Sequence, residues 1–519
     1  MNSFNGDVQR NANRRGSRQN HGLVLTSCFA IWLMTTTVGA AEREPNVIQR
    51  ENAKTGSSDW QLTRVKLDDP NKGRTSLIEG YCSQQSVSAG EKIDIMVSTN
   101  PPRPFRIEIF RTGYYGGKGA RLMTTLGPFQ GEKQPTPTPD AKNLHECKWK
   151  PSTSLTIPND WVSGVYLGRL TTITPDENEA SWQSYVVFIV RDDRPADILL
   201  QCSDNTWQAY NEWPSKYSVY THPKGNQGPW ADVSFDRPYG RYAQHNSVVN
   251  NPLSAGSGEW LLFEFPLAYF LEQHGYDVAY CSNRDMITPD RGLKTKCFIS
   301  VGHDEYWDIR QYHSVVKMRD AGVSLLFLSG NAVCWVTPLR DGYDGRPHRI
   351  MFRGGPYGGD YKYAVDRQKE NGPFPERGPD EGFLIGARNV EPVNGGADWV
   401  ITKPDHWIFA GSGVKKGDRI PGLVGWEYHG DPPAIPGLEV VAEGTALVGG
   451  VRPQRWTATV YPGPKNNYVF NASTIFWSQG LSSPPGHVLP WSHWTRPHGP
   501  DERVQQITHN LLKRAVAGK

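Results

Sequence analysis

The chain has 519 residues, more than one hydrophobic core can organise, so two or three domains are expected. Lys and Arg total 56 against 53 Asp and Glu, without a basic stripe, which argues against nucleic acid or an anionic membrane surface as a partner. The seven cysteines are too sparse for a disulfide scaffold. They show neither a CxxC pair nor zinc-ligand spacing, which excludes the small disulfide-rich and zinc-finger classes.

Residues 1–41 have the pattern of an export signal. Four arginines precede an apolar run over residues 23–38, and the small residues 39–41 form a cleavage site. Arg14 and Arg15 hint at twin-arginine export, with Sec export open as the alternative and a single-pass anchor as the alternative to cleavage. Removal of the signal leaves 52 basic and 52 acidic residues. We therefore expect a periplasmic or secreted protein with no integral membrane span after signal removal.

The next two regions differ in pattern. Residues 42–75 are polar and lack a clear period, and we expect a linker or a strap there. Over residues 76–193, short alternating runs are separated by Pro/Gly turns, which predicts an immunoglobulin-like β-sandwich. The clearest runs are KIDIMVST, FRIEIFRTG, GVYLGRLTT and SYVVFIVRD. Cys82 and Cys147 could form one disulfide bridge within this domain.

Residues 194–519 have the pattern of an α/β domain. Continuous apolar runs at residues 197–203, 296–302 and 323–330 are typical of strands buried on both faces of a parallel sheet. Helical patterns at residues 259–274 and 304–321 lie between these runs, and a glycine closes each. Strand and helix alternate, so a doubly wound layer is expected.

Polar and aromatic side chains follow the three strands directly. SVGHDEYW places His303, Asp304 and Glu305 after the second strand, Asn331 follows the third, and Tyr210 in DNTWQAY follows the first. Ligands of open α/β sheets bind in the crevice beyond the carboxyl ends of the strands, so these side chains are expected to converge there. We interpret Asp304 separately, as the N-cap of the helix that follows.

Six sequence blocks resemble a known family. They are FRTGYYGGKGAR, SFDRPY, SVGHDEYW, FLSGNAVCW, GLVGWEY and FNASTIFWSQGL, and they are similar to blocks of the large (beta) subunit of N,N-dimethylformamidase. The similarity runs from residue 81 to the carboxyl end, and its most specific part is SVGHDEYW with an asparagine 26 residues after Glu305. The resemblance implies a catalytic domain with a class I glutamine amidotransferase-like (flavodoxin-like) fold. It further implies a mononuclear Fe(III) bound by two tyrosinates and one glutamate, which hydrolyses the C–N bond of a small amide.

Carried over one residue at a time, the resemblance assigns the metal ligands. Glu305 matches the glutamate, Tyr210 the first tyrosine, and Tyr239 of SFDRPY the second, with Tyr242 as the open alternative. Three anionic oxygen donors suit ferric iron. A phenol with a pKa of about 10 loses its proton at neutral pH only when a strong cation displaces it, so metal and tyrosinates require each other.

The resemblance also implies three further roles. His303 matches the histidine beside the metal, Asn331 the asparagine that faces it, and Glu427 of GLVGWEY is assigned to an acid near the substrate. The iron would act as a Lewis acid, His303 would take a proton from water, Asn331 would hold the developing oxyanion, and Glu427 would protonate the leaving amine. A homo-oligomer or a small second subunit stays open. The chain departs from the family in lacking the length of the characterised large subunits and in carrying an export signal.

The 18 tryptophans leave an alternative function open. Aromatic platforms in an exported protein could line a carbohydrate-binding cleft, with the β-sandwich as a recognition module and the amidotransferase-like domain non-catalytic. An acyl-enzyme mechanism is less favoured, because the turn at residues 301–305 has no cysteine or serine and Cys334 has no partnered base visible in the sequence.

Overall fold

The computed structural model describes residues 44–517 except 69–72, 175–178, 221–230, 241–251, 359–375, 392–395 and 488–498. The predicted export signal and Tyr242 lie outside these residues. Every helix in the described ranges is too short or too polar to cross a membrane.

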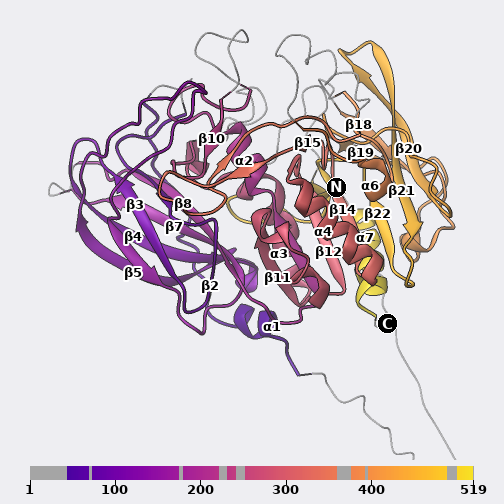
Figure 1. The fold of residues 1–519 in the computed structure, drawn as a ribbon. Helices are drawn as coiled ribbons and strands as arrows, with labels where there is room; N and C mark the ends of the chain where they lie inside the picture. Colours follow the sequence, from indigo (N-terminus) through magenta and orange to yellow (C-terminus); the bar gives the residue numbers. More distant parts are fainter. Residues whose placement is uncertain are drawn as a thin grey trace, which may run out of the picture. The chain divides into compact units, whose positions relative to one another are not determined.

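Two sheets pack against each other in the amino-terminal third, where Figure 1 draws the strands in purple. One has the strand order β1-β3-β6 and the other β2-β8-β7-β4-β5. Buried and more exposed side chains alternate over the first half of β3 and of β4, because neighbouring side chains point to opposite faces; the second half of each strand is buried throughout. The strands are β1 (Glu79–Cys82), β2 (Ser86–Ser88), β3 (Lys92–Ser98), β4 (Pro104–Thr112), β5 (Ala120–Gln130), β6 (Thr153–Thr156), β7 (Gly164–Thr172) and β8 (Gln183–Arg191).

A seven-stranded sheet forms the α/β layer. Its order is β11-β9-β12-β14-β22-β21-β20; the first five strands are parallel, and β21 and β20 add an antiparallel hairpin. Numbered along the chain, the parallel strands lie in the order 2-1-3-4-5. The strands are β9 (Ile198–Cys202), β11 (Val278–Ser282), β12 (Cys297–Gly302), β14 (Ser324–Ser329), β20 (Glu439–Val448), β21 (Arg452–Pro462) and β22 (Tyr468–Asn471).

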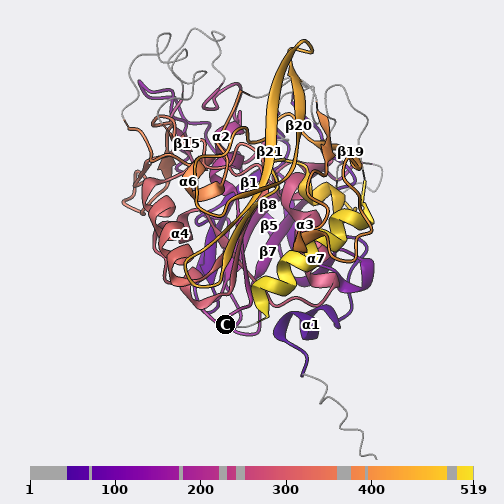
Figure 2. The same ribbon diagram turned by 90° about the vertical axis from the view of Figure 1, so that its right-hand side faces the viewer.

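Helices cover both faces of this sheet (Figure 2). On one face, α3 (Phe265–Gln273) and α7 (Glu502–Val516) pack on side chains such as Leu200 and Ile299. On the other, α4 (Ile309–Ala321) and α6 (Gly382–Ile385) pack on side chains such as Leu199 and Phe298. Neighbouring residues of one strand thus enter opposite cores, which explains the continuous apolar runs.

Short paired segments surround the carboxyl ends of the strands. Helix α2 (Asp204–Tyr210) follows β9, and later segments form three small sheets, with the strand orders β10-β17-β16, β13-β15 and β18-β19. Residues 339–380 contain one hairpin of these sheets, and their range 359–375 is outside the described residues. The segments are β10 (Val233–Ser234), β13 (Tyr306–Trp307), β15 (Trp335–Val336), β16 (Leu339–Arg340), β17 (Ile350–Met351), β18 (Ala397–Val400) and β19 (Arg419–Val424).

Two predicted helices begin later than expected. Pro266 cannot donate a backbone hydrogen bond, so residues 260–264 form a π turn and α3 starts at Phe265. The cap of α4 is Asp308, whose side chain accepts from the Arg310 amide, and the interpretation of Asp304 as that cap is wrong. Asp304 is buried and accepts hydrogen bonds from Gln201, Ser300 and Asn283. These bonds hold the Asp304 side chain in the interior, near the carboxyl end of β12.

Residues 44–68 pack as a strap, the second of the two expected forms. The strap contains α1 (Val47–Asn52) and the fully buried Trp60, whose indole donates to the Lys118 carbonyl and meets the ring of Phe265 edge-on. It therefore contacts both the sandwich and the α/β layer. Cys82 and Cys147 are both free and buried, so the possible bridge between them is absent.

Candidate metal centre

The site begins where β12 ends. Gly302 has a positive φ of 69°, and a Cβ there would meet Phe263 at 2.4 Å, so only glycine fits this turn without strain. This turn directs the Asp304 side chain into the interior beneath the sheet, where it binds Gln201. His303 and Glu305 instead belong to a buried cluster of polar side chains. All three side chains are buried.

Both oxygens of Glu305 accept hydrogen bonds from tyrosines. Tyr210, the last residue of α2, donates its hydroxyl to Oε2 at 2.8 Å, and Tyr220 donates to Oε1 at 2.9 Å. The side-chain amide of Asn331 donates to the same Oε1 at 3.2 Å. Tyr210 and Asn331, both expected to meet Glu305 at this edge, are thus joined to it, together with one tyrosine that was not expected.

The two tyrosines form a pair. Their rings stack with centres 4.6 Å apart, and Tyr306 donates its hydroxyl to Tyr220. Burial raises the pKa of both phenols well above 10, and the charge of Glu305 raises it further. The guanidinium of Arg353 lies 5.1 Å from the ring centre of Tyr220 and acts in the opposite direction. Both phenols therefore keep their protons at neutral pH unless a cation replaces them.

His303 lies among three carboxylates. Its Nε2 is 2.7 Å from Glu427 Oε2 and 3.2 Å from Glu305 Oε2, and its Nδ1 is 3.8 Å from Glu259 Oε2. Burial alone would lower the pKa of His303, but the negative charge of Glu427 and the proximity of Glu259 and Glu305 hold that pKa well above 6.5. Burial raises the pKa of Glu427 and of Glu259. One imidazolium thus compensates a buried anionic cluster.

Asn331 sits at the start of a strained loop after β14. Its backbone is left-handed, with φ of 53°, and its Nδ2 points to Glu305. The opposite atom, Oδ1, is buried and has no hydrogen-bond partner among the residues the structure describes. An unpaired buried oxygen beside a carboxylate cluster is a position for a ligand or an ordered water.

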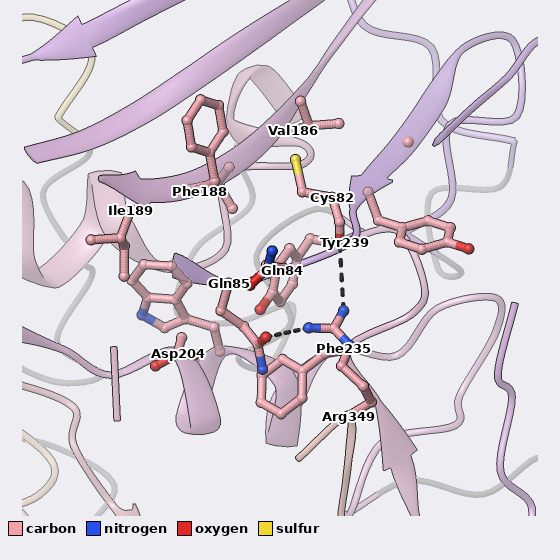
Figure 3. A pocket seen from close by; sticks show the side chains of 14 residues that line it. Cys82, Gln84, Gln85, Val186, Phe188, Ile189, Asp204, Phe235, Tyr239 and Arg349 are labelled. Carbon is pink, nitrogen blue, oxygen red and sulfur yellow. Dashed lines mark hydrogen bonds between the residues drawn. The ribbon is translucent and has the colours of Figure 1, made fainter. Parts of the chain in front are cut away.

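Tyr239 lies in a different place. It lines a pocket of about 430 Å³ of empty space, partly open to solvent, between β1, β8 and α2, with Gln85 and Arg349 (Figure 3). Its ring meets Trp207 edge-on at 6.3 Å, and no hydrogen bond or ring contact joins it to Glu305 in the described part of the chain. The position expected for Tyr239 beside Glu305 is taken by Tyr220.

The sequence interpretation missed two members of the cluster. Tyr220 lies ten residues after Tyr210 in a segment without a clear period, and nothing distinguished it from the other 21 tyrosines. Glu259 carried a signal, because it is an acidic residue at the start of the apolar run EWLLFEF and is only 2 % exposed. A buried acid in such a run requires a partner, and His303 supplies it.

Two overlapping donor sets in this cluster can hold a metal ion. The first comprises the phenol oxygens of Tyr210 and Tyr220 with the Glu305 carboxylate, each phenol within hydrogen-bond distance of one carboxylate oxygen. The second comprises His303, Glu305 and Glu427, whose ligand atoms lie within 4.8 Å of one another. The first set consists of hard oxygen donors, which favour a trivalent or hard divalent cation.

The tryptophans are part of the cores. Of the 14 tryptophans that the structure describes, 12 are buried and Trp182 and Trp407 are half-buried, so none of them offers an open aromatic platform.

Comparison with known proteins gives one match. The family model described as N,N-dimethylformamidase beta subunit-like, C-terminal, matches residues 106–491, a range that includes every residue of the cluster. No curated protein matches the chain.

Proposed function

Because the chain belongs to the N,N-dimethylformamidase beta subunit-like family, we propose that it hydrolyses the C–N bond of a small amide with the help of a mononuclear Fe(III). The arrangement around Glu305 carries this proposal: two phenols on its separate oxygens, with His303 and Asn331 facing the same carboxylate. We further propose that the protein is exported to the periplasm or secreted, on the basis of residues 1–41.

The fold supports the same proposal. The parallel strand order 2-1-3-4-5, with helices on both faces, is the order of flavodoxin-like doubly wound domains. We assign residues 194–519 to a class I glutamine amidotransferase-like layer and residues 76–193 to an immunoglobulin-like sandwich. The cluster lies at the carboxyl ends of β9, β12 and β14, where such sheets bind ligands.

The residues fit a ferric ion. Tyr210, Tyr220 and Glu305 would hold it, and three anionic oxygens would balance its charge. The phenol protons, which now lie between each tyrosine and Glu305, are those that the cation would replace. When bound, iron supplies Lewis-acid polarisation of the amide carbonyl.

The remaining residues supply proton transfer and orientation. His303 is protonated and its Nε2 lies 2.7 Å from Glu427 Oε2. Once His303 has passed this proton to Glu427, the neutral imidazole can take a proton from water and Glu427 can protonate the leaving amine. The Nδ2 of Asn331 offers a donor to the oxyanion that develops on the amide carbonyl, while the free Oδ1 accepts from water or an amide N–H. The ring of Phe263 packs against His303 and against Trp426, and these apolar rings limit the access of bulk water.

The assay of amine release tests the function. Iron-loaded protein is expected to release amine from small formamides and acetamides, and Glu427→Gln is expected to lower turnover by at least about 100-fold, the usual contribution of a general acid or base. Tyr239→Phe serves as the matched control, because Tyr239 lines the separate pocket. An iron-loaded protein that hydrolyses none of these amides, or a Glu427→Gln variant with unchanged turnover, would refute the proposal.

A further inference from the structure

The loop that carries Asn331 is strained at two points. Asn331 and Val333 both have left-handed backbones, with φ of 53° and 52°. For a β-branched residue such as Val333 this conformation is unfavourable, and it persists only when surrounding contacts impose it. The contacts that hold residues 330–334 therefore set the direction of the Asn331 side chain.

His429 holds the middle of this loop. Its Nε2 accepts a hydrogen bond from the Ala332 amide at 3.1 Å, and its Nδ1 lies 2.7 Å from Asn471 Oδ1. Asn471 Oδ1 also accepts from the Ser473 amide, so it acts as an acceptor and His429 carries its proton on Nδ1. The ring is fully buried, and burial lowers the pKa of His429 to about 4. A neutral imidazole in a fixed tautomer is what the contact with Ala332 requires.

Asn389 holds the carbonyl side of the same loop. Its side-chain Nδ2 donates to the carbonyls of Ala332 and Val333, at 3.1 and 3.3 Å. Its backbone N–H donates to the carboxylate of Glu381. Asn389 and His429 are themselves joined by an antiparallel backbone bridge. Asn389 and His429 therefore bind the same loop, and their own backbones are paired with each other.

Glu427 lies in the same segment as His429, two residues before it. A Cβ at Gly330 would lie 2.1 Å from the Glu427 carbonyl, so the loop and this segment touch through their backbones. Glu427 contacts His303, and two residues later His429 contacts the Asn331 loop. The segment 427–429 therefore fixes the distance between two candidate catalytic side chains.

We propose that His429 and Asn389 are positioning residues that clamp the strained loop and aim Asn331 at the reacting amide. This inference rests on the proposed hydrolysis for its kinetic consequence, but its structural content is independent of it. Among the described residues, His429 reaches the loop through the Ala332 amide, and Asn389 reaches it through the carbonyls of residues 332 and 333.

A matched pair of variants tests the clamp. In His429→Gln, the side-chain oxygen can occupy the place of Nε2 and accept from Ala332, whereas His429→Asn keeps a donor near Nδ1 and loses that acceptor. We expect turnover to fall about 10- to 100-fold in His429→Asn, the usual effect of misplacing a catalytic group, with KM and iron content unchanged. His429→Gln should recover turnover to within about threefold of the wild type.

Hydrogen exchange at single-residue resolution gives the second readout. The Ala332 amide should exchange faster in His429→Asn than in the wild type and stay protected in His429→Gln. If the wild type cleaves no amide, the proposed function fails, and this measurement still decides the clamp. Equal exchange of Ala332 in all three proteins, or equal turnover in both variants of an active enzyme, would overturn it.

Asn389→Ser provides a milder test if the His429 variants do not fold. It removes the donor to the two loop carbonyls and leaves the backbone bridge in place. Exchange across residues 331–334 should accelerate, and the same loss of turnover without a change of KM is expected. Unchanged exchange in a folded Asn389→Ser variant would also contradict the clamp.

Discussion

Glu305 meets four polar neighbours with only two oxygens. Tyr210 and His303 lie at Oε2, and Tyr220 and Asn331 lie at Oε1. Tyr210, Tyr220 and Asn331 donate hydrogen bonds to the carboxylate and His303 lies at ion-pair distance, so both oxygens of Glu305 have polar partners in the absence of a cation. Loss of Glu305 should therefore affect metal binding, while loss of a neighbour outside the donor set should affect only chemistry.

The pair Glu305→Gln and His303→Gln tests this division. Glu305→Gln is expected to lose iron and activity together, because the amide cannot supply the anionic oxygens. His303→Gln should keep iron while turnover falls by at least about 100-fold, since proton transfer is lost. Iron analysis and amine release check both. Retention of iron by Glu305→Gln would remove Glu305 from the ligand set.

Glu381 predicts a pH-dependent stability. Burial raises its pKa from 4.5 to about 7, and only one of its oxygens accepts a hydrogen bond, from the Asn389 amide. Its pKa is higher in the folded state, so its contribution is full below pH 4.5 and is lost as pH rises to about 7. Glu381→Gln keeps an acceptor for Asn389 but cannot ionise.

Urea unfolding of the two proteins between pH 4 and pH 9 measures the effect. The stability of Glu381→Gln relative to the wild type should increase with pH from about 4.5 to about 7 by an amount of the order of 3 kcal/mol, then level off. Other titrating groups cancel in this comparison. A stability difference that does not change with pH would show that Glu381 titrates normally.

At the scale of elements, the site forms where the carboxyl ends of β9, β12 and β14 lie close to the segment 427–429. Gly330 is the point of closest approach, because a Cβ there would lie 2.1 Å from the Glu427 carbonyl and 2.7 Å from the Ile475 amide. These are backbone atoms, which cannot move aside as a flexible side chain can.

Gly330→Ala should therefore separate β14 from the segment that carries Glu427. We expect a loss of about 1–3 kcal/mol in the free energy of unfolding, as for other overpacked positions, together with reduced turnover. Gly499→Ala is the control, because a Cβ at Gly499 meets no atom within 4 Å. Thermal unfolding and amine release compare the two, and equal stability of the variants would contradict the close approach.

The strands of this site follow from the sequence. β9, β12 and β14 are buried on both faces, so their runs are continuously apolar and their carboxyl ends are easily located. The residues directly after them, Tyr210, His303, Glu305 and Asn331, could therefore be named and are brought together. The start of α4 could not be predicted, because Asp304 and Asp308 are both able to cap a helix. Only the buried hydrogen-bond partners of Asp304 distinguish the two.

Contacts between residues far apart in the sequence could not be predicted from the sequence alone. Tyr220 and Tyr239 are both in segments with little regular structure, and which one reaches Glu305 depends on how the chain folds back after α2. The support of Asn331 comes from residues 58 and 98 positions later in the sequence, Asn389 and His429. Such contacts have no local period that a sequence pattern could reveal.

At the scale of the whole molecule, a buried ion pair joins the sandwich to the α/β layer. Arg111 of β4 donates to Glu272 of α3 at 2.7 Å, and both side chains are fully buried. Glu272 also accepts from Tyr280 of β11 and from Asn52 of the strap. This pair therefore links the strap, the sandwich and the α/β layer.

A double-mutant cycle tests the link. Arg111→Met and Glu272→Leu should each lower the free energy of unfolding by about 3–5 kcal/mol, because each leaves a buried charge without its partner. The double variant should lose much less than the sum of the two, since both charges are removed. Urea unfolding measures all four proteins. Additive losses would show that the two side chains do not act as a pair.

The most direct test of the account is the iron content and visible absorption of the purified protein, compared with Tyr220→Phe and Tyr239→Phe. The account predicts about one iron per chain and a tyrosinate-to-iron absorption band, both altered or lost in Tyr220→Phe and retained in Tyr239→Phe, because Tyr220 donates to Glu305 whereas Tyr239 lines a separate pocket. An iron band that survives in Tyr220→Phe and disappears in Tyr239→Phe, or a protein that binds no iron, would contradict it.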